Sequence, residues 1–224
     1  MKHGFILSKE NVKYKKHYDI VANDSNIHNI VHEAIEKHGP DVDLNNIDVS
    51  QVTDMRSLFN ITGFEGDVSQ WDVSNVTNMY CMFGGCAKFN GYLNDWNVKN
   101  VKKMANMFIN CRNFNSPLNN WEVSSVEDMG KMFLGCHMFD QDLTDWNVKN
   151  VKNMGSMFAK CIKFKGKGVG SWNMKNVENI EYMFRFCSEF EEDLCNWDLS
   201  SCKNMNDYLY GTKVSSYNKP FVKI

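Results

Sequence analysis

Six tryptophans recur at an almost constant interval along this 224-residue chain. Successive members of the set lie 25, 25, 25, 26 and 25 residues apart, at Trp71, Trp96, Trp121, Trp146, Trp172 and Trp197. A fixed period of this size is typical of stacked repeats rather than of one globular core. A unit of this length cannot bury its own apolar face, so we expect each repeated position to pack on its own copies in the neighbouring units.

Other apolar residues return in register with the tryptophans. A methionine or isoleucine column reads Met79, Met104, Met129, Met154, Ile180 and Met205. Two phenylalanine columns read Phe83, Phe108, Phe133, Phe158, Phe184 and Phe89, Phe114, Phe139, Phe164, Phe190. The same slots are filled before the first tryptophan by Ile47, Val49, Val52, Met55 and Phe59, and after the last by Leu199, Cys202, Met205 and Leu209. The pattern therefore predicts about seven rungs of 24–26 residues between residues 43 and 211.

The spacing inside one rung predicts its local structure. Apolar and polar residues alternate at Trp96-Asn97-Val98, which indicates a short strand. From Val101 to Met104 the apolar residues are three apart, which suits a short α or 3₁₀ helix. An N-cap residue precedes it in each rung, at Asn75, Asn100, Ser125, Asn150, Asn176 and Ser201. The expected fold class is α/β, a solenoid with one short strand and one short helix in each rung.

The two ends differ from the repeats. Apolar residues at Ile27, Ile30, Val31, Ala34 and Ile35 predict an amphipathic helix that starts after Asp24-Ser25-Asn26 and stops at Gly39-Pro40. We expect this helix to close the first rung, because the open end of a solenoid exposes its core. The predicted division is an N-terminal segment with a capping helix (1–42), the repeats (43–211) and a C-terminal tail or cap (212–224). The tail could fold back through Val214, Tyr217, Phe221, Val222 and Ile224.

Composition narrows the function classes. The net charge of −2 argues against a nucleic-acid reader. No run of 18 apolar residues indicates membrane insertion, and the first residues lack a signal-peptide pattern, so the chain as written is expected in the cytoplasm. An unusual export route or a trimmed leader would change that expectation.

Catalysis needs unlike residues around one pocket, whereas these columns place like residues beside each other, so we expect no enzyme, no catalytic residues and no cofactor. His28 and His32 lie four apart, but a solvated helix face is favoured over a metal site.

Five of the eight cysteines form one inward column, at Cys86, Cys111, Cys136, Cys161 and Cys187. Thr62 and Thr212 occupy the same repeat position in the end rungs, which indicates that this position requires a small side chain. We favour reduced, packed thiols, although neighbours in this column would be close enough for a disulfide. Cys81 and Cys195 fall in outward columns and are the better candidates for reactive thiols.

Outward columns must carry any binding function, since inward ones are committed to packing. The flanks of the predicted strands form a polar face, whose candidate binding residues are Asp72, Asp95, Asn97, Lys99, Glu122, Asp145, Asn147, Lys149, Asn173 and Lys175. A second column, from Lys102 through Glu127, Lys152 and Glu178 to Lys203, alternates in charge and predicts an exposed ion-pair ladder. The sequence shows no exposed aromatic cluster. A loop with an extra residue, 164–169, is interpreted as a neutral bulge, with a binding protrusion at Lys163, Lys165 and Lys167 as the alternative.

These residues resemble the BspA-like leucine-rich-repeat surface protein family, in the form found in mycoplasma-type surface lipoproteins. Its repeat is similar to the segment that runs from Phe89-Asn90 through Leu93, Trp96, Val98, Val101 and Met104 to Met107-Phe108. The resemblance implies a right-handed leucine-rich-repeat-like solenoid and a role in surface adhesion or protein recognition. The sequence as written shows no lipoprotein leader, and we therefore expect a departure from the family in location; the added cysteine column fits a reducing compartment.

Together these patterns predict a non-enzymatic protein–protein interaction module with an unknown protein partner, used as a monomer and located in the cytoplasm or, by resemblance, at the cell surface. The alternative is a structural or assembly protein that packs through the ends or sides of its solenoid.

Overall fold

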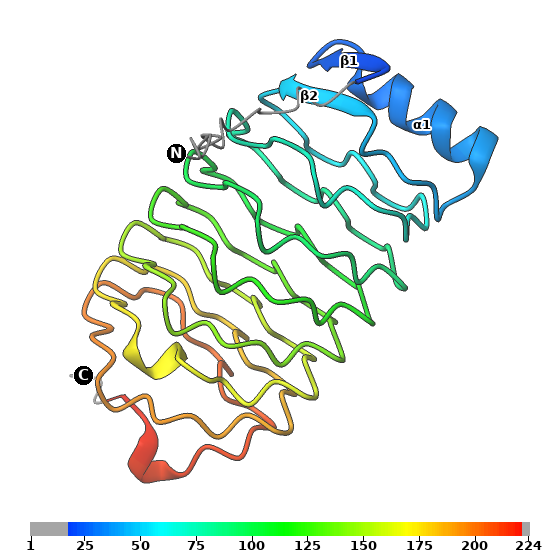
Figure 1. Ribbon diagram of the computed structural model, residues 1–224. Helices are drawn as coiled ribbons and strands as arrows, with labels where there is room; N and C mark the ends of the chain where they lie inside the picture. Colours follow the sequence, from blue (N-terminus) through cyan, green and yellow to red (C-terminus); the bar gives the residue numbers. More distant parts are fainter. Residues whose placement is uncertain (1–17, 221–224) are drawn as a thin grey trace, which may run out of the picture.

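The computed structural model describes residues 18–220, and Figure 1 shows them as an elongated stack of chain turns. Its regular elements are few: β1 (Ile20–Asn23), α1 (Ile27–His38), β2 (Ile47–Gln51) and two short 3₁₀ helices, η1 (Val169–Ser171) and η2 (Ser216–Asn218). Strands β1 and β2 are parallel, with Ile20 opposite Ile47 and Val21 opposite Asp48. Strand β1 and helix α1 lie at one end of the stack, and η2 lies at the other.

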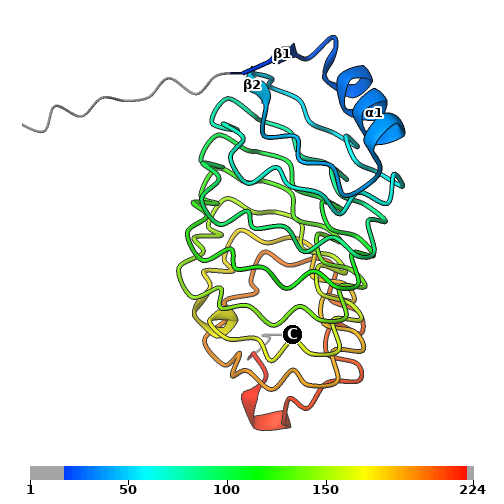
Figure 2. The ribbon, with the colours of Figure 1, turned by 45° about the vertical axis from the view of Figure 1, so that its right-hand side comes forward.

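Parallel bridges join the successive turns of the chain. They connect one position in each of seven rungs, at Asp54, Asn78, Lys103, Asp128, Asn153, Asn179 and Asn204. The view in Figure 2 shows the rungs following one another along a single long axis. The kinship with leucine-rich repeats and the handedness of the coil remain predictions.

Like residues pack on like residues through the whole interior. The rings of Phe83 and Phe108 lie 5.5 Å apart and nearly parallel, and those of Trp121 and Trp146 lie 6.5 Å apart. Each tryptophan side chain is almost fully buried. Each indole Nε1 also donates to a backbone carbonyl in the preceding rung, as Trp121 does to Leu93 O at 2.8 Å. The column therefore buries apolar area without leaving its N–H groups unpaired.

The segment after each bridge, called here the Met–Phe limb (Met104–Cys111 in the third rung), is not helical. The N–H groups of Met104 and Asn106 donate to carbonyls of the next rung, at 3.0 and 2.9 Å, whereas Met107 N donates to Met104 O within the limb. Asn106 and Asn110 have φ of 60° and 59°. The predicted short helix is therefore wrong. The three-residue spacing of the limb comes from tight turns, in which alternate N–H groups donate to the next rung. Residues with left-handed backbone conformation interrupt any helix.

The short strand predicted for every rung is also absent from the described rungs after the first. Strand β2 has β1 as its partner, but the later segments from tryptophan to valine make no backbone ladder with their neighbours. The expected N-cap residues serve a different purpose, because Asn100 Nδ2 donates to Ser74 O of the preceding rung at 2.7 Å. Asn75, Asn150 and Asn176 do the same. These amides connect rungs instead of starting helices.

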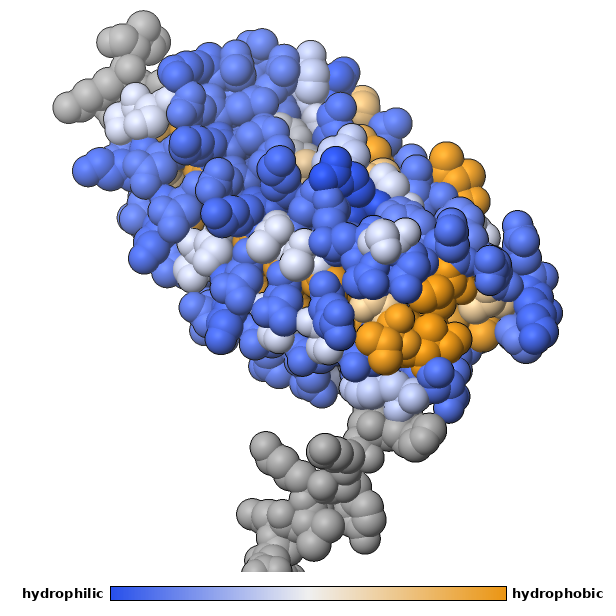
Figure 3. All heavy atoms as spheres, turned by 90° about the horizontal axis from the view of Figure 1, so that it is seen from above, coloured by the Kyte–Doolittle hydropathy of each residue, from blue (hydrophilic) through white to orange (hydrophobic). Residues whose placement is uncertain are grey.

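The predicted N-terminal helix is present as α1, from Ile27 to His38, and it ends at Gly39, whose φ is 93°. Ile27 and Val31 are fully buried in the common core, and they close the interior of the first rung. Apolar side chains nevertheless gather on the surface at this end (Figure 3), where Ile20, Ile30, Ala34 and Ile47 help to line a hollow of about 470 Å³.

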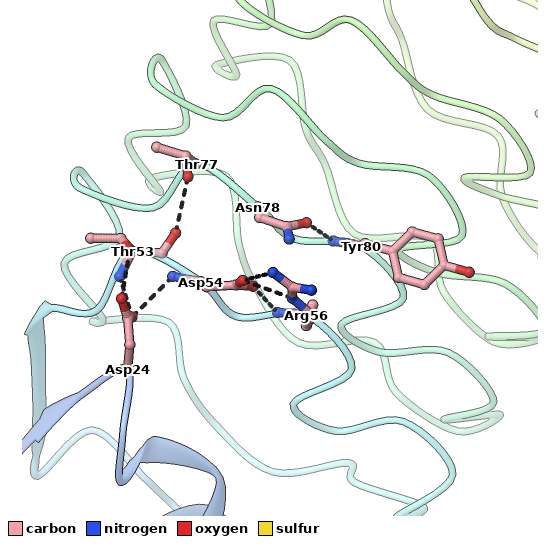
Figure 4. A network of polar contacts seen from close by, with 7 residues as sticks. All are labelled: Asp24, Thr53, Asp54, Arg56, Thr77, Asn78 and Tyr80. Carbon is pink, nitrogen blue, oxygen red and sulfur yellow. Dashed lines mark hydrogen bonds and ion pairs between the residues drawn. The ribbon is translucent and has the colours of Figure 1, made fainter.

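Asp24, just before α1, completes a backbone ladder that the first rung would otherwise leave open (Figure 4). In the inner rungs a backbone N–H at this position donates to the preceding rung, as Thr77 N does to Thr53 O at 2.9 Å. The line from Thr77 in Figure 4 is the bond of its hydroxyl to the same carbonyl, at 3.3 Å. The first rung has no such neighbour. The Asp24 carboxylate instead accepts from Thr53 N, Thr53 Oγ1 and Asp54 N, at 2.7, 2.6 and 3.1 Å.

Replacing Asp24 by alanine is expected to lower the free energy of unfolding by about 1 kcal/mol, because hydrogen bonds to a charged acceptor are lost at an exposed site. Its bonds to Thr53, first among the causes, lower the pKa of Asp24 below the ordinary value of 3.8. The contribution of Asp24 is therefore complete above that ordinary value and disappears as pH falls through the lower, folded-state pKa. Urea unfolding at pH 7 and pH 2 measures it. The difference between wild type and variant should shrink at pH 2, and Asp41→Ala, at an exposed aspartate beyond the other end of α1, should change little at either pH.

The C-terminal tail begins an eighth turn over only part of the last rung. Lys213 N donates to Phe190 O and Leu194 N donates to Asn218 O, at 2.9 and 3.0 Å. Val214 packs on the core, but Tyr217 is 89% exposed. The other residues expected to fold back, Phe221, Val222 and Ile224, lie outside the described part of the chain.

The loop with the extra residue lies on the rim of the stack. Lys165 and Lys167 form ion pairs with Asp140 and Asp142 of the preceding rung, at 3.2 and 2.6 Å. The Lys167 ammonium, first among the causes, lowers the pKa of Asp142 to about 2. These two lysines are therefore paired with the preceding rung while remaining 62% and 73% exposed, and the binding protrusion at Lys163, Lys165 and Lys167 stays a prediction.

Candidate functional site: polar face and aromatic cluster

All ten residues predicted for the polar face are exposed. Several of their side chains are already bound locally: Asn97, Asn147 and Asn173 each accept a hydrogen bond from the backbone N–H two residues on, at 3.2–3.4 Å. Asp95, Asn97 and Glu122 border an open hollow of about 350 Å³. The face is thus polar and exposed, and part of its hydrogen-bonding capacity serves the turns beneath it.

The alternating charged column forms only one side-chain pair in the described residues, Lys203 with Glu178 at 2.5 Å. That lysine lowers the pKa of Glu178. The backbone connects the other members, since Lys102, Glu127, Lys152, Glu178 and Lys203 each donate a backbone N–H to the carbonyl of the same column one rung before. Register here is fixed by the main chain rather than by the predicted ion-pair ladder.

All eight cysteines are free. Each inward thiol donates to a phenylalanine carbonyl of the preceding rung, as Cys111 Sγ does to Phe83 O at 3.0 Å. Burial raises the pKa of Cys86 to about 11 and that of Cys187 to about 12. The pKa of Cys81 is also raised, by burial, and that of Cys195 is raised first by its hydrogen bond to Asp193. A raised pKa disfavours the thiolate, so the structure gives no support for unusual reactivity at either outward cysteine.

A polar hollow of about 400 Å³ lies over the middle rungs. Its floor is a ladder in which Asn179 Nδ2 donates to Asn153 Oδ1 and Asn153 Nδ2 donates to Asp128 Oδ1, at 3.0 and 2.9 Å. A Cβ at Gly130 or Gly155 would stand 2.5 or 2.8 Å from these amides. Gly130 and Gly155 are therefore required because a larger residue would collide with the amides of the ladder.

Sequence reasoning missed an exposed aromatic cluster around Arg185. The guanidinium carbon of Arg185 lies 4.9, 5.1 and 5.5 Å from the ring centroids of Tyr182, Phe186 and Tyr210. Phe186 and Tyr210 meet edge to face at 5.5 Å and are 44% and 56% exposed. Arg185 Nε is buried and has no hydrogen-bond partner. We name these four residues the Arg185 cluster.

The signal for this cluster was present in the repeat alignment. Tyr182, Arg185 and Phe186 stand where the preceding rung has Ser156, Ala159 and Lys160. The expectation that no exposed aromatic cluster exists was wrong, because each outward column was compared only along its own copies and not with the columns beside it. These residues occupy three different outward columns and meet a fourth residue, Tyr210, from the next rung.

Between residues 18 and 220 no group of three histidine, cysteine or acidic side chains is placed to hold a metal ion. His28 and His32 lie on α1. No helix in the same part of the chain has the length and apolar character needed to cross a membrane.

A comparison with protein families matches the chain over most of its length. The profile of the family described as "Mycoplasma protein of unknown function, DUF285" matches residues 26–144 and 110–221, which include α1 and every rung. The comparisons with curated proteins and with solved structures give no match.

Proposed function

We propose that this chain, which belongs to the DUF285 family of mycoplasma proteins of unknown function, is a non-enzymatic protein-binding module whose partner docks on the Arg185 cluster. The family match supports a repeat protein and assigns it no activity. The finer likeness to BspA-like leucine-rich-repeat surface proteins, and a role in adhesion or recognition at the cell surface, belong to this proposal.

The observation that carries the proposal is the Arg185 cluster itself. Tyrosine and arginine are enriched among the residues that dominate protein–protein binding energy. Here one guanidinium contacts three aromatic rings, two of which are about half exposed. A partner that covers Phe186 and Tyr210 would desolvate the charge and strengthen its attraction to the rings. A carboxylate of that partner could also pair with the guanidinium, since Arg185 is in none of the ion pairs formed among the described residues.

The polar face is the secondary candidate for the same function. Its ten residues are exposed over successive rungs, a geometry that suits an extended or convex protein surface. It lacks an exposed aromatic anchor, and its amides already serve local turns. We therefore expect it to shape the rim of an interface more than to supply its energy.

Affinity capture from an extract of the source cells, followed by mass spectrometry, tests the proposal with three immobilised forms of the protein. One is wild type. The second carries Tyr182→Ser, Arg185→Ala and Phe186→Lys, which gives this rung the residues of its predecessor and so leaves the repeat intact. The third carries Asp95→Ala, Asn97→Ala and Lys99→Ala on the polar face.

A protein retained by wild type and by the polar-face variant, but held at least about 30-fold more weakly by the cluster variant, is the expected result. Loss of binding only in the polar-face variant would move the site to that face. If no protein is retained specifically by the wild type, the interaction module itself is rejected.

A further inference from the structure

The last Met–Phe limb has an open edge that every other limb has closed. Between the sixth and seventh rungs the backbone N–H groups of alternate residues donate downward, to the carbonyls of the following limb, at 2.8–2.9 Å. These donors are Ile180, Tyr182, Phe184 and Phe186, and the acceptors are Asn204, Asn206, Tyr208 and Tyr210. The five earlier junctions repeat this arrangement.

In the seventh limb the corresponding N–H groups have no acceptor among residues 18–220. They belong to Met205, Asp207, Leu209 and Gly211. The tail does not supply one, because Lys213 N donates to Phe190 O and Asn218 O accepts from Leu194 N, which are in a different part of the last rung. The limb thus presents four backbone donors in a row and no acceptor on that edge.

The apolar side chains of the seventh limb lack cover in the same way. Met205, Tyr208 and Leu209 are only partly buried, whereas Ile180, Met183 and Phe184, which occupy the same columns one rung earlier, are fully buried. A row of unpaired backbone groups beside exposed apolar side chains is a template for the addition of another chain. At the end that carries α1, by contrast, the apolar side chains of the first limb are covered, since Met55 and Phe59 are fully buried.

We propose that this edge binds a segment of another protein that carries the Met-x-x-Met-Phe repeat pattern, which would add an eighth limb. At each of the six junctions between limbs, the same kind of edge is covered by the following limb. That limb supplies a carbonyl at every second residue and apolar side chains in the methionine and phenylalanine columns. A second copy of this chain could not supply its first limb without displacing α1, which is why we infer a different protein. This is edge addition of a peptide, with main-chain bonds giving affinity and the columns giving specificity.

The test uses the full-length protein and a synthetic peptide of residues 126–139, which is a limb of this chain, with Cys136→Thr to prevent oxidation. The control peptide carries in addition Met129→Asn, Met132→Asn and Phe133→Asn. Hydrogen exchange of individual backbone amides is measured with each peptide at saturating concentration.

We expect the limb peptide to slow exchange at least about tenfold at Met205, Asp207, Leu209 and Gly211, and the control peptide to leave these amides unchanged. Amides of Ile180 and Phe184 should be slow throughout. Unchanged exchange at the four amides would overturn the proposal, whether or not the peptide binds elsewhere. Strong protection in the dilute protein alone would overturn it too, and protection that rises with protein concentration would assign the edge to a second copy instead.

Discussion

Replacing Trp121 by alanine is expected to lower the free energy of unfolding by about 3–5 kcal/mol. The side chain is 2% exposed, and its ring lies 6.4 Å from Phe108 and 6.5 Å from Trp146. Its Nε1 also donates to Leu93 O, in the preceding rung. The cavity would lie in the middle of the stack, where rungs on both sides depend on this contact. Equilibrium unfolding in urea, followed by tryptophan fluorescence and circular dichroism, gives the difference.

Trp121→Phe is the matched control, because it keeps most of the apolar volume and removes the indole donor. We expect a loss of about 1–2 kcal/mol, from a smaller ring and from the lost indole hydrogen bond to Leu93 O, which still accepts from Trp96 N at 3.1 Å. A loss below about 1 kcal/mol for Trp121→Ala would mean that the columns do not hold the rungs together.

Replacing Gly168 by alanine is expected to destabilise the protein by about 3 kcal/mol, from two causes that add. Gly168 has φ of 89°, and the left-handed region costs a side chain about 1–2 kcal/mol. A Cβ there would also stand 2.3 Å from Thr144 N and 2.4 Å from Thr144 Cα, which are backbone atoms that cannot turn aside. Overpacking of this kind adds about 1–3 kcal/mol. Thermal unfolding with calorimetry measures the sum.

Gly85→Ala separates the two causes. Gly85 has φ of 78°, but its nearest neighbour to an added Cβ is Ile61 at 3.7 Å, an ordinary contact. Only the conformational cost of about 1–2 kcal/mol should remain. Equal losses in the two variants would show that the close approach to Thr144 contributes nothing.

The tryptophan period was enough to predict which residues lie inside, because a column can be buried only by its own copies. The same period says nothing about backbone conformation. A three-residue spacing from Val101 to Met104 fits a helix, but it fits equally a chain of tight turns whose alternate N–H groups leave the rung. The glycines Gly85 and Gly135 were the available signal, since both stand at left-handed positions, but Asn110 and Lys160 fill the same column and conceal it.

The candidate site was harder to predict than the core, for a reason that lies in the repeat itself. Comparing copies emphasises positions that agree, and the polar face was chosen because Asn97 and Asn147 return in register. In the structure these repeated asparagines accept hydrogen bonds from the backbone N–H two residues on, so they recur because they stabilise the turns. Arg185 and Phe186 differ from their counterparts in the neighbouring rungs, and only their contact with Tyr210 of the next rung reveals a cluster.

The one-way hydrogen bonding of the Met–Phe limbs gives the whole molecule a direction. Among the limb groups that bond between rungs, the carbonyl groups aim toward the end with α1 and the N–H groups toward the end with Gly211. A unit of about 25 residues could be duplicated or deleted between Asp128 and Asn153 while both termini kept their chemistry, since an inner rung meets only its two neighbours. The number of rungs can therefore vary without any change in the chemistry of the two ends.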